Sequence, residues 1–267
     1  MQAKDEGFPL PGPAANDAGA PKLVMPGRKL RAGEGVEWVS AGWRLFRKSS
    51  LMWIVFLVLF VLIHVVLGLV PWIGSLLGNL LSPILLGGIA LGCRSLESGG
   101  ELDLEHFLAG FRRNTGPLFA IGVIYVLGWL VLLGVFAMFV GWSIVIAALT
   151  GGGGEVVSAV TGGMFGLALG GLVVAALAIP LMAAYWFAPP LVMLHDMPAL
   201  PAMKESLFAS LRNWVPFLVY GLVMGALAIA ASIPLGLGLL VWLPLLVTSS
   251  YASYRAVFTE PDEAAEG

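Results

Sequence analysis

Long apolar stretches separated by short polar ones make up most of this chain. Six of these stretches reach the roughly 20 residues that a helix needs to cross a bilayer. They cover residues 51–70, 72–93, 117–148, 162–194, 215–233 and 235–258. The third and fourth are too long for one straight span, so we expect them to tilt or to project beyond the lipid. The pattern predicts an all-α integral membrane protein with six transmembrane helices.

The six runs form three pairs, and a similar segment precedes each pair. In every copy an apolar residue stands before a polar pair, shortly before a transmembrane run begins. The copies read AGWRLFRKSSLMW (41–53), FLAGFRRNTGPLF (107–119) and SLFASLRNWVPF (206–217). The second run of each pair also carries a proline ahead of its polar end: Pro83 before Arg94, Pro189 before His195-Asp196, and Pro244 before Arg255. Because proline bends a helix, we predict three hairpin repeats with bends near these prolines.

The residues upstream of each hairpin have the period of a helix with one apolar face. The three faces consist of Val36, Val39, Trp43 and Phe46; Leu104, Phe107, Leu108 and Phe111; and Leu200, Met203, Leu207 and Leu211. Short helices of this kind lie in the membrane interface with the apolar face toward lipid. We therefore expect an amphipathic interfacial helix before each hairpin, with a role as simple connectors as the alternative.

Composition supports a membrane environment for most of the chain. Of its 267 residues 59% are hydrophobic and 11% charged, and the mean hydropathy is +0.94. Soluble domains carry about 25% charged residues. We predict a disordered cytoplasmic tail over residues 1–33, a six-helix membrane domain over 34–259, and an acidic C-terminal tail over 260–267. The first apolar run begins only after the Pro-rich tail, so we expect it to act as a signal anchor that stays in the mature protein.

The distribution of positive charge predicts the orientation. With six spans, the N-terminus, the second loop, the fourth loop and the C-terminus share one side of the membrane. All 14 lysines and arginines fall on that side: Lys4, Lys22, Arg28, Lys29, Arg31, Arg44, Arg47, Lys48, Arg94, Arg112, Arg113, Lys204, Arg212 and Arg255. Positive residues collect in cytoplasmic loops. The chain is therefore expected in a bacterial inner membrane with both ends in the cytoplasm.

Ionisable side chains inside the predicted spans are scarce, which argues against catalysis. His64 is the one titratable residue deep in an apolar run, and a lone neutral histidine usually hydrogen-bonds to a neighbouring helix. His106 and His195 lie at cytoplasmic edges, without metal-binding spacing such as H-E-x-x-H. A single cysteine, Cys93, excludes an intramolecular disulfide and a thiolate cluster.

We therefore expect no catalytic residue, cofactor or metal site, and no enzyme. General acid-base chemistry needs a titratable group near the reacting atom. The acidic residues near the second loop (Glu97, Glu101, Asp103 and Glu105) stand beside Arg94, Arg112 and Arg113, and mixed-sign surface clusters of this kind contribute little. An active site built from Asp103, Glu105 and His106 stays open as an alternative. The net charge of −2 gives no footprint for nucleic acid.

Glycines recur every four residues in several spans. The sets are Gly74 and Gly78; Gly88 and Gly92; Gly162, Gly166 and Gly170; and Gly221 and Gly225. Small residues at this spacing let membrane helices approach closely, so we expect helix contacts at each set.

The segments EWVSAGWRLFRKSSLMWI and LLSPILLGGIALGCRSL, followed by FLAGFRR, resemble an uncharacterised proteobacterial inner-membrane family. That family is distantly similar to YciC-type proteins and to the membrane domain of some glycerophosphoryl diester phosphodiesterases. The resemblance covers residues 26–258 and implies six spans, with no catalytic residues. We expect a non-enzymatic protein acting through membrane lipids or other membrane proteins; the alternative is a transporter or channel for a lipid-like or hydrophobic solute.

Overall fold

The computed structural model describes residues 22–70, 73–150 and 155–260. In these residues it is all-helical, and one isolated bridge, Leu23 to Thr259, is the only extended pairing. The helices are α1 (Glu34–Lys48), α2 (Ser50–Gly68), α3 (Ile73–Glu97), α4 (Leu104–Leu108), α5 (Thr115–Thr150), α6 (Glu155–Trp186), α7 (Ala188–His195), α8 (Ala199–Arg212), α9 (Trp214–Ser232) and α10 (Leu239–Phe258). A short 3₁₀ turn, η2 (Ala109–Phe111), follows α4.

Five helical segments in the described part of the chain are long and apolar enough to cross a membrane. They cover Ser50–Gly68, Ile73–Glu97, Thr115–Ile146, Gly163–His195 and Trp214–Ser232, close to five of the six predicted runs. The sixth run matches α10, which has 20 residues but a less apolar composition. Its C-terminal half contains Thr248, Ser249, Ser250, Ser253 and Arg255, and these residues lower its hydropathy.

The fourth predicted run is divided into two helices. α6 ends at Trp186 and α7 begins at Ala188, so Pro189 and Pro190 lie in the first turn of a new helix and not at a bend within one helix. Proline fits there because the first-turn N–H groups have no intrahelical partner. Pro83 and Pro244, in contrast, lie inside α3 and α10, as predicted.

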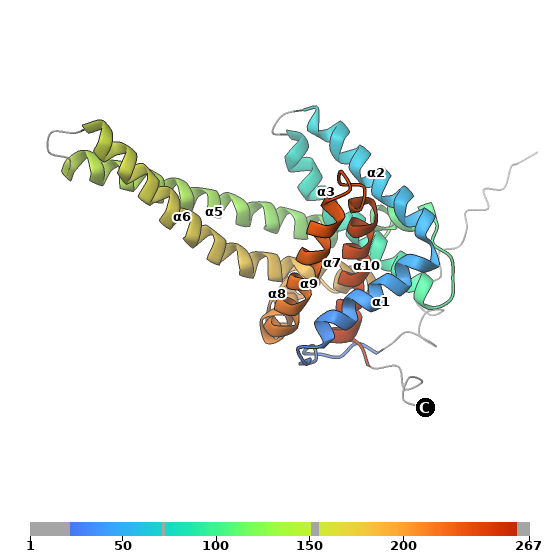
Figure 1. Ribbon diagram of the computed structural model, residues 1–267. Coiled ribbons are helices and arrows are strands. Elements are labelled where there is room, and N and C mark those ends of the chain that lie inside the picture. Colours follow the sequence, from blue (N-terminus) through green and yellow to red (C-terminus); the bar gives the residue numbers. More distant parts are fainter. Residues whose placement is uncertain (1–21, 71–72, 151–154, 261–267) are drawn as a thin grey trace, which may run out of the picture.

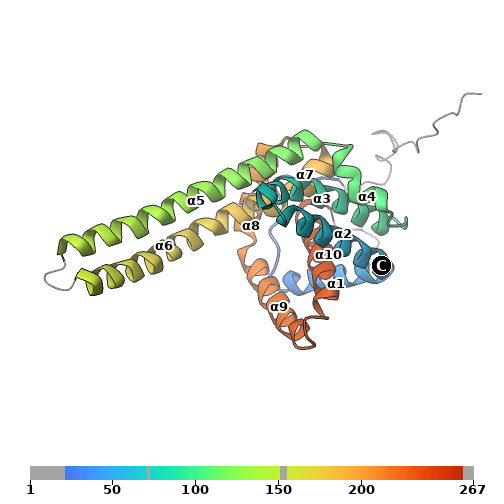
Figure 2. The same cartoon turned by 90° about the horizontal axis from the view of Figure 1, so that it is seen from above.

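Two parts of different shape make up the molecule (Figure 1). α5 and α6 run side by side as a long arm, and the same arm leaves the body in the view from above (Figure 2). With 36 residues, α5 is about 54 Å long, well beyond the about 30 Å of a hydrocarbon core. The α2–α3 and α9–α10 hairpins both point upward from the body in Figure 1, while α1 and the C-terminal end of α10 lie lower.

The core of the body surrounds α7. Seven of its eight residues are buried, from Ala188 to Leu194, and α7 contacts α3 and α8. Phe187, Leu191 and Met193 are fully inaccessible to solvent. The short helix that follows the proline break is therefore the packing centre on which α3, α8 and the base of the arm meet.

α1 packs on α9 and α10 through a different face from the predicted one. The buried residues are Gly35, Trp38, Gly42, Leu45 and Phe46. Of the predicted stripe only Phe46 is buried; Val36 and Trp43 are 49% and 41% exposed. The sequence analysis named the stripe expected to face lipid and missed this packing face, because glycines make its close contacts. A Cβ at Gly42 would lie 2.6 Å from the backbone nitrogen of Ser249.

The other two predicted apolar stripes also stay largely exposed. Phe107 and Met203 are buried, but most of their partners are not. The exposed members are Leu104, Leu108, Phe111, Leu200 and Leu211, each at least 42% accessible. The second copy is also shorter than expected, since α4 has five residues.

Residues 22–33 are ordered, in contrast to the prediction of a disordered tail over 1–33. The Val24 N–H donates to the Phe258 carbonyl at 2.8 Å. Asn213, which is fully buried, accepts from Leu30 N–H at 2.8 Å and donates to the Arg28 carbonyl at 2.9 Å. The segment is thereby fastened to the end of α10 and the α8–α9 junction. The parts of the two predicted tails over 1–21 and 261–267 lie outside the described residues.

The glycine spacing predicts close packing correctly in some sets and wrongly in another. A Cβ at Gly74 would collide with the Leu67 carbonyl of α2, and one at Gly170 would lie 3.0 Å from the Phe139 Cβ of α5. Gly221 and Gly225, however, have no neighbouring atom within 4 Å of the Cβ position. They lie on the free side of α9, which contacts α1 and α10 through other faces.

Candidate functional site

His64, the histidine predicted to lie deep in a span, is held locally on α2. Its Nδ1 lies 2.9 Å from the Phe60 carbonyl one turn earlier, and the two rings are 4.2 Å apart. The other side of the ring faces Gly78 of α3, where a Cβ would lie 3.1 Å from His64 Cδ2. His64 therefore fills the space that the glycine leaves between α2 and α3.

The alternative active site at Asp103, Glu105 and His106 forms the start of α4. The Asp103 N–H donates to His106 Nδ1 at 3.1 Å, so the imidazole caps the helix N-terminus. Cys93 is fully buried at the end of α3. Among the described residues no three His, Cys, Asp or Glu side chains are grouped so that they could hold a metal ion.

Polar side chains meet at the C-terminal ends of α3 and α10. Arg255 Nε lies 2.9 Å from the Glu97 carboxylate, and the Tyr251 hydroxyl donates to the same carboxylate at 2.8 Å. The Arg255 side chain is 14% exposed. The Glu97 side chain is 35% exposed, so this pair is partly shielded. With its additional hydrogen bond it joins the end of the first hairpin to the end of the third.

A second ion pair joins the start of α5 to the end of α7. Arg113 Nη2 lies 3.0 Å from Asp196 Oδ2, and the Asn114 amide donates to Asp196 Oδ1 at 2.7 Å and to the Val192 carbonyl at 2.9 Å. The Asn114 hydrogen bond and the Arg113 charge hold the pKa of Asp196 below its ordinary range. Asp196 itself adopts the left-handed conformation that ends α7, with φ 53°.

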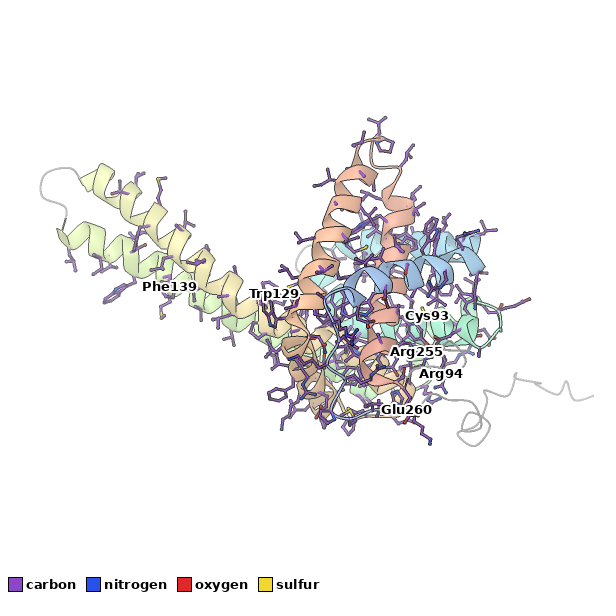
Figure 3. All side chains as sticks on the ribbon, turned by 60° about the horizontal axis from the view of Figure 1, so that its bottom comes forward. Cys93, Arg94, Trp129, Phe139, Arg255 and Glu260 are labelled. Atoms are coloured by element: carbon purple, nitrogen blue, oxygen red, sulfur yellow. The ribbon has the colours of Figure 1, made fainter. Side chains whose placement is uncertain are left out.

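The two ion pairs are linked through His195 and Tyr254. The His195 Nε2 and the Tyr254 hydroxyl form a short hydrogen bond. Arg94 lies within electrostatic range of both groups. In Figure 3, which turns the lower side of the body forward, Arg94 and Arg255 lie together on the body, while Phe139 lies out on the arm. We call this set (Arg94, Glu97, Arg113, Asp196, His195, Tyr251, Tyr254 and Arg255) the base cluster.

The repeat pattern points to three positions of the base cluster. Arg94, His195-Asp196 and Arg255 each follow a proline at the end of the second run of a pair, and the fold brings these ends together. The partners Glu97 and Arg113 were assigned to a solvated surface cluster, because their charge partners are 158 and 83 residues away in sequence. In the structure the base cluster mainly neutralises charge and fastens four helices to one another.

A second feature is an apolar groove between α1, α9 and α10. Its volume is about 470 Å³, and no charged side chain lines it. Val36, Ser40 and Trp43 line it from α1, and Val223 and Leu227 line it from α9. On the α10 side, the indole N–H of Trp242 donates to the Met224 carbonyl at 2.9 Å. The one polar atom of this side chain is therefore paired, and the rest of the indole gives the groove an apolar wall. Three residues of the α1 stripe that was predicted to face lipid, Val36, Val39 and Trp43, therefore border an open groove.

Comparison with known proteins places the chain among bacterial membrane proteins. It is 30% identical to the "Probable inner membrane protein BTH_II0599" of Burkholderia thailandensis, across 86% of this chain and 93% of the relative. The chain belongs to the family of this inner-membrane protein. Its apolar helices agree with that family, and the protein is a multi-pass inner-membrane protein. No family model and no solved structure matches the chain.

Proposed function

We propose that this protein is a non-enzymatic, six-span membrane protein that acts through contacts with membrane lipids on the cytoplasmic side of the inner membrane. The observation that carries the proposal is the exposed apolar face of the three short helices. Trp43 of α1, Leu108 of α4 and Leu200 of α8 are 41%, 46% and 68% exposed. In water such a surface would be costly, whereas in the headgroup region it lies against lipid.

The charges near these helices support the same placement. Arg44, Arg112 and Lys204 stand on or beside the three helices, and all are exposed. Basic residues next to an apolar interfacial face are attracted to anionic headgroups. In this orientation the N- and C-termini lie in the cytoplasm, and the arm and the two shorter hairpins enter the lipid.

α10 is the sixth span in this proposal. Its polar C-terminal half lies beside the base cluster and not in lipid: Thr248, Ser249 and Ser253 are fully buried in the protein. The chain order of one short helix before each hairpin supports the threefold repeat, and the same segments support a distant relationship to YciC-type proteins. The hairpins differ in length, since α5 has 36 residues and α9 has 19.

A carrier for a lipid-like solute is the second candidate, and the groove beside α1 favours it. The two candidates predict different lipid contents. Protein extracted with its native membrane patch, purified and analysed by lipid mass spectrometry should retain a selected lipid class at fixed stoichiometry if it works by lipid contact. A lipid composition equal to that of the bulk membrane would contradict the proposal. Time-dependent exchange of a hydrophobic probe between two leaflets would favour the carrier.

The non-enzymatic part of the proposal has its own test. We predict that His64→Ala, and a combined Asp103→Asn, Glu105→Gln and His106→Ala variant, insert normally and fully complement a deletion phenotype. The reason is that these side chains contact neighbouring helices or cap α4 and lack the arrangement that proton transfer requires. A variant that is folded in the membrane yet inactive would favour the carrier hypothesis or an enzymatic function over the proposed one.

A further inference from the structure

The groove between α1, α9 and α10 runs along the α9–α10 hairpin, from α1 to Gly238. α1 crosses α9 near Tyr220, which Gly35 approaches, and crosses α10 at Ser249, which Gly42 approaches. From there the α9 wall continues from Val223 to Ala231, toward the end of the hairpin. The nine residues from Val223 to Ala231 rise about 12 Å, a length that accommodates much of one acyl chain.

The side of α1 that faces the groove ends in positive charge. Arg44 and Arg47 follow Ser40 and Trp43 by four residues, so they lie one turn further along the same side of the helix. Both are exposed. Within the described chain, neither guanidinium forms an ion pair or a hydrogen bond with another side chain.

We infer that this groove binds one acyl chain of an anionic glycerophospholipid from the cytoplasmic leaflet, with its phosphate held by Arg44 and Arg47. An uncharged channel with cations at one end matches an amphiphile, whose chain is apolar and whose headgroup is an anion. Guanidinium groups bind phosphate oxygens through paired hydrogen bonds. This inference rests on the proposed function, because it requires that the protein act through lipid contacts. It adds the class of lipid and the residues that bind it.

Filling the groove tests the site for the acyl chain. Native mass spectrometry would be recorded on the detergent-solubilised protein with added phosphatidylglycerol. Leu227→Trp places an indole in the groove and should weaken lipid retention at least tenfold. The matched control is Leu222→Trp on the same helix, outside the groove and 67% exposed, which should bind as the unmodified protein does. If Leu227→Trp does not fold, Val241→Trp fills the groove from the opposite wall and replaces it in the same measurement.

Removing the charges tests the site for the headgroup. An Arg44→Gln, Arg47→Gln protein should lose its preference for phosphatidylglycerol over phosphatidylcholine. A Lys22→Gln, Lys29→Gln protein, which removes two exposed charges outside the three short helices, should keep it. Equal lipid retention by the Leu227→Trp and Leu222→Trp proteins would overturn the groove and leave the proposed function standing. If the unmodified protein is a dimer and Leu227→Trp makes it monomeric, the groove binds a second copy of the chain and not a lipid. An unmodified protein that retains no lipid would contradict the proposed function itself.

Discussion

At the scale of single residues, Ser206 holds together the break between α6 and α7. Its hydroxyl accepts from the Phe187 N–H at 2.9 Å and donates to the Ala183 carbonyl at 2.6 Å. In a continuous helix these two backbone groups would bond to one another. The side chain is fully buried and replaces that bond where Pro189 and Pro190 end the helix.

We predict that Ser206→Ala lowers the free energy of unfolding by about 1–3 kcal/mol, because the buried Phe187 N–H loses its partner and the Ala183 carbonyl keeps only a 3.4 Å bond from Ser210. Ser232→Ala is the matched control: its hydroxyl bonds the Ala228 carbonyl at an exposed site. The control should stay within about 0.5 kcal/mol. Thermal unfolding of both proteins in the same detergent measures the difference, and equal midpoints would show that the hydroxyl does not stabilise the break.

Asp196 gives the base cluster a pH dependence of known sign. Its folded pKa lies below the ordinary value of 3.8, since Asn114 and Arg113 favour the carboxylate. The unfolded chain therefore takes up the proton first, so the stabilisation is complete above about pH 5 and is lost as the pH falls through 3.8 and below. We predict that Asp196→Asn costs at most about 1 kcal/mol near neutral pH, because the side chain is 59% exposed. The difference in Tm from the unmodified protein should shrink at acidic pH; a difference that stays constant would contradict this assignment.

The residue pairs of the base cluster were beyond the reach of sequence reasoning. Glu97 and Arg255 lie in different hairpins, and nothing in their local spacing indicates that α3 and α10 end side by side. The proline pattern predicts that Arg94, His195 and Arg255 are equivalent positions of a repeat. It could not show that these equivalent positions meet, because that depends on how the hairpins pack around α7.

At the scale of helices, α1 is fastened by glycines. We predict that Gly42→Ala destabilises the protein by about 1–3 kcal/mol, since the new methyl would lie 2.6 Å from backbone atoms of α10 that cannot move aside. Gly225→Ala on α9 meets no atom within 4 Å and should be neutral or stabilise by up to about 1 kcal/mol. Thermal unfolding in detergent compares the two, and a Gly42→Ala protein as stable as Gly225→Ala would exclude close packing of α1 on α10.

Hydropathy predicts the existence of helices here better than their faces or ends. α2, α3, α5 and α9 follow the apolar runs within a few residues, because a helix in lipid must satisfy its own backbone. The break at Phe187 within the fourth run could not be predicted from hydropathy, since α6 and α7 are both apolar. The packing face of α1 was not predicted, because Gly35 and Gly42 carry no hydrophobic signal.

At the scale of the whole molecule, three hairpins leave a common base in which charge is concentrated. The arm of α5 and α6 extends away from the body in both views (Figures 1 and 2). Its exposed residues include Trp142 at 67% and Leu172 at 68%, as expected of helices that face lipid along most of their length. The positive charges and the three short helices, by contrast, lie toward the hairpin bases. The charge distribution along the sequence thus predicts that one end of the molecule is polar. The direction in which the arm leaves the body depends on the packing of α5 on α3 and of α6 on α8, which the sequence does not indicate.

The central claim is that α10 crosses the membrane and completes a third hairpin. Single cysteines at Leu237 and Glu260, in a Cys93→Ala background, place its two ends. Leu237 is 66% exposed at the start of the helix. We predict that a membrane-impermeant maleimide labels Leu237→Cys in intact spheroplasts and labels Glu260→Cys only after the membrane is permeabilised. Labelling of both positions from the same side would contradict the sixth span and the placement of the base in the cytoplasm.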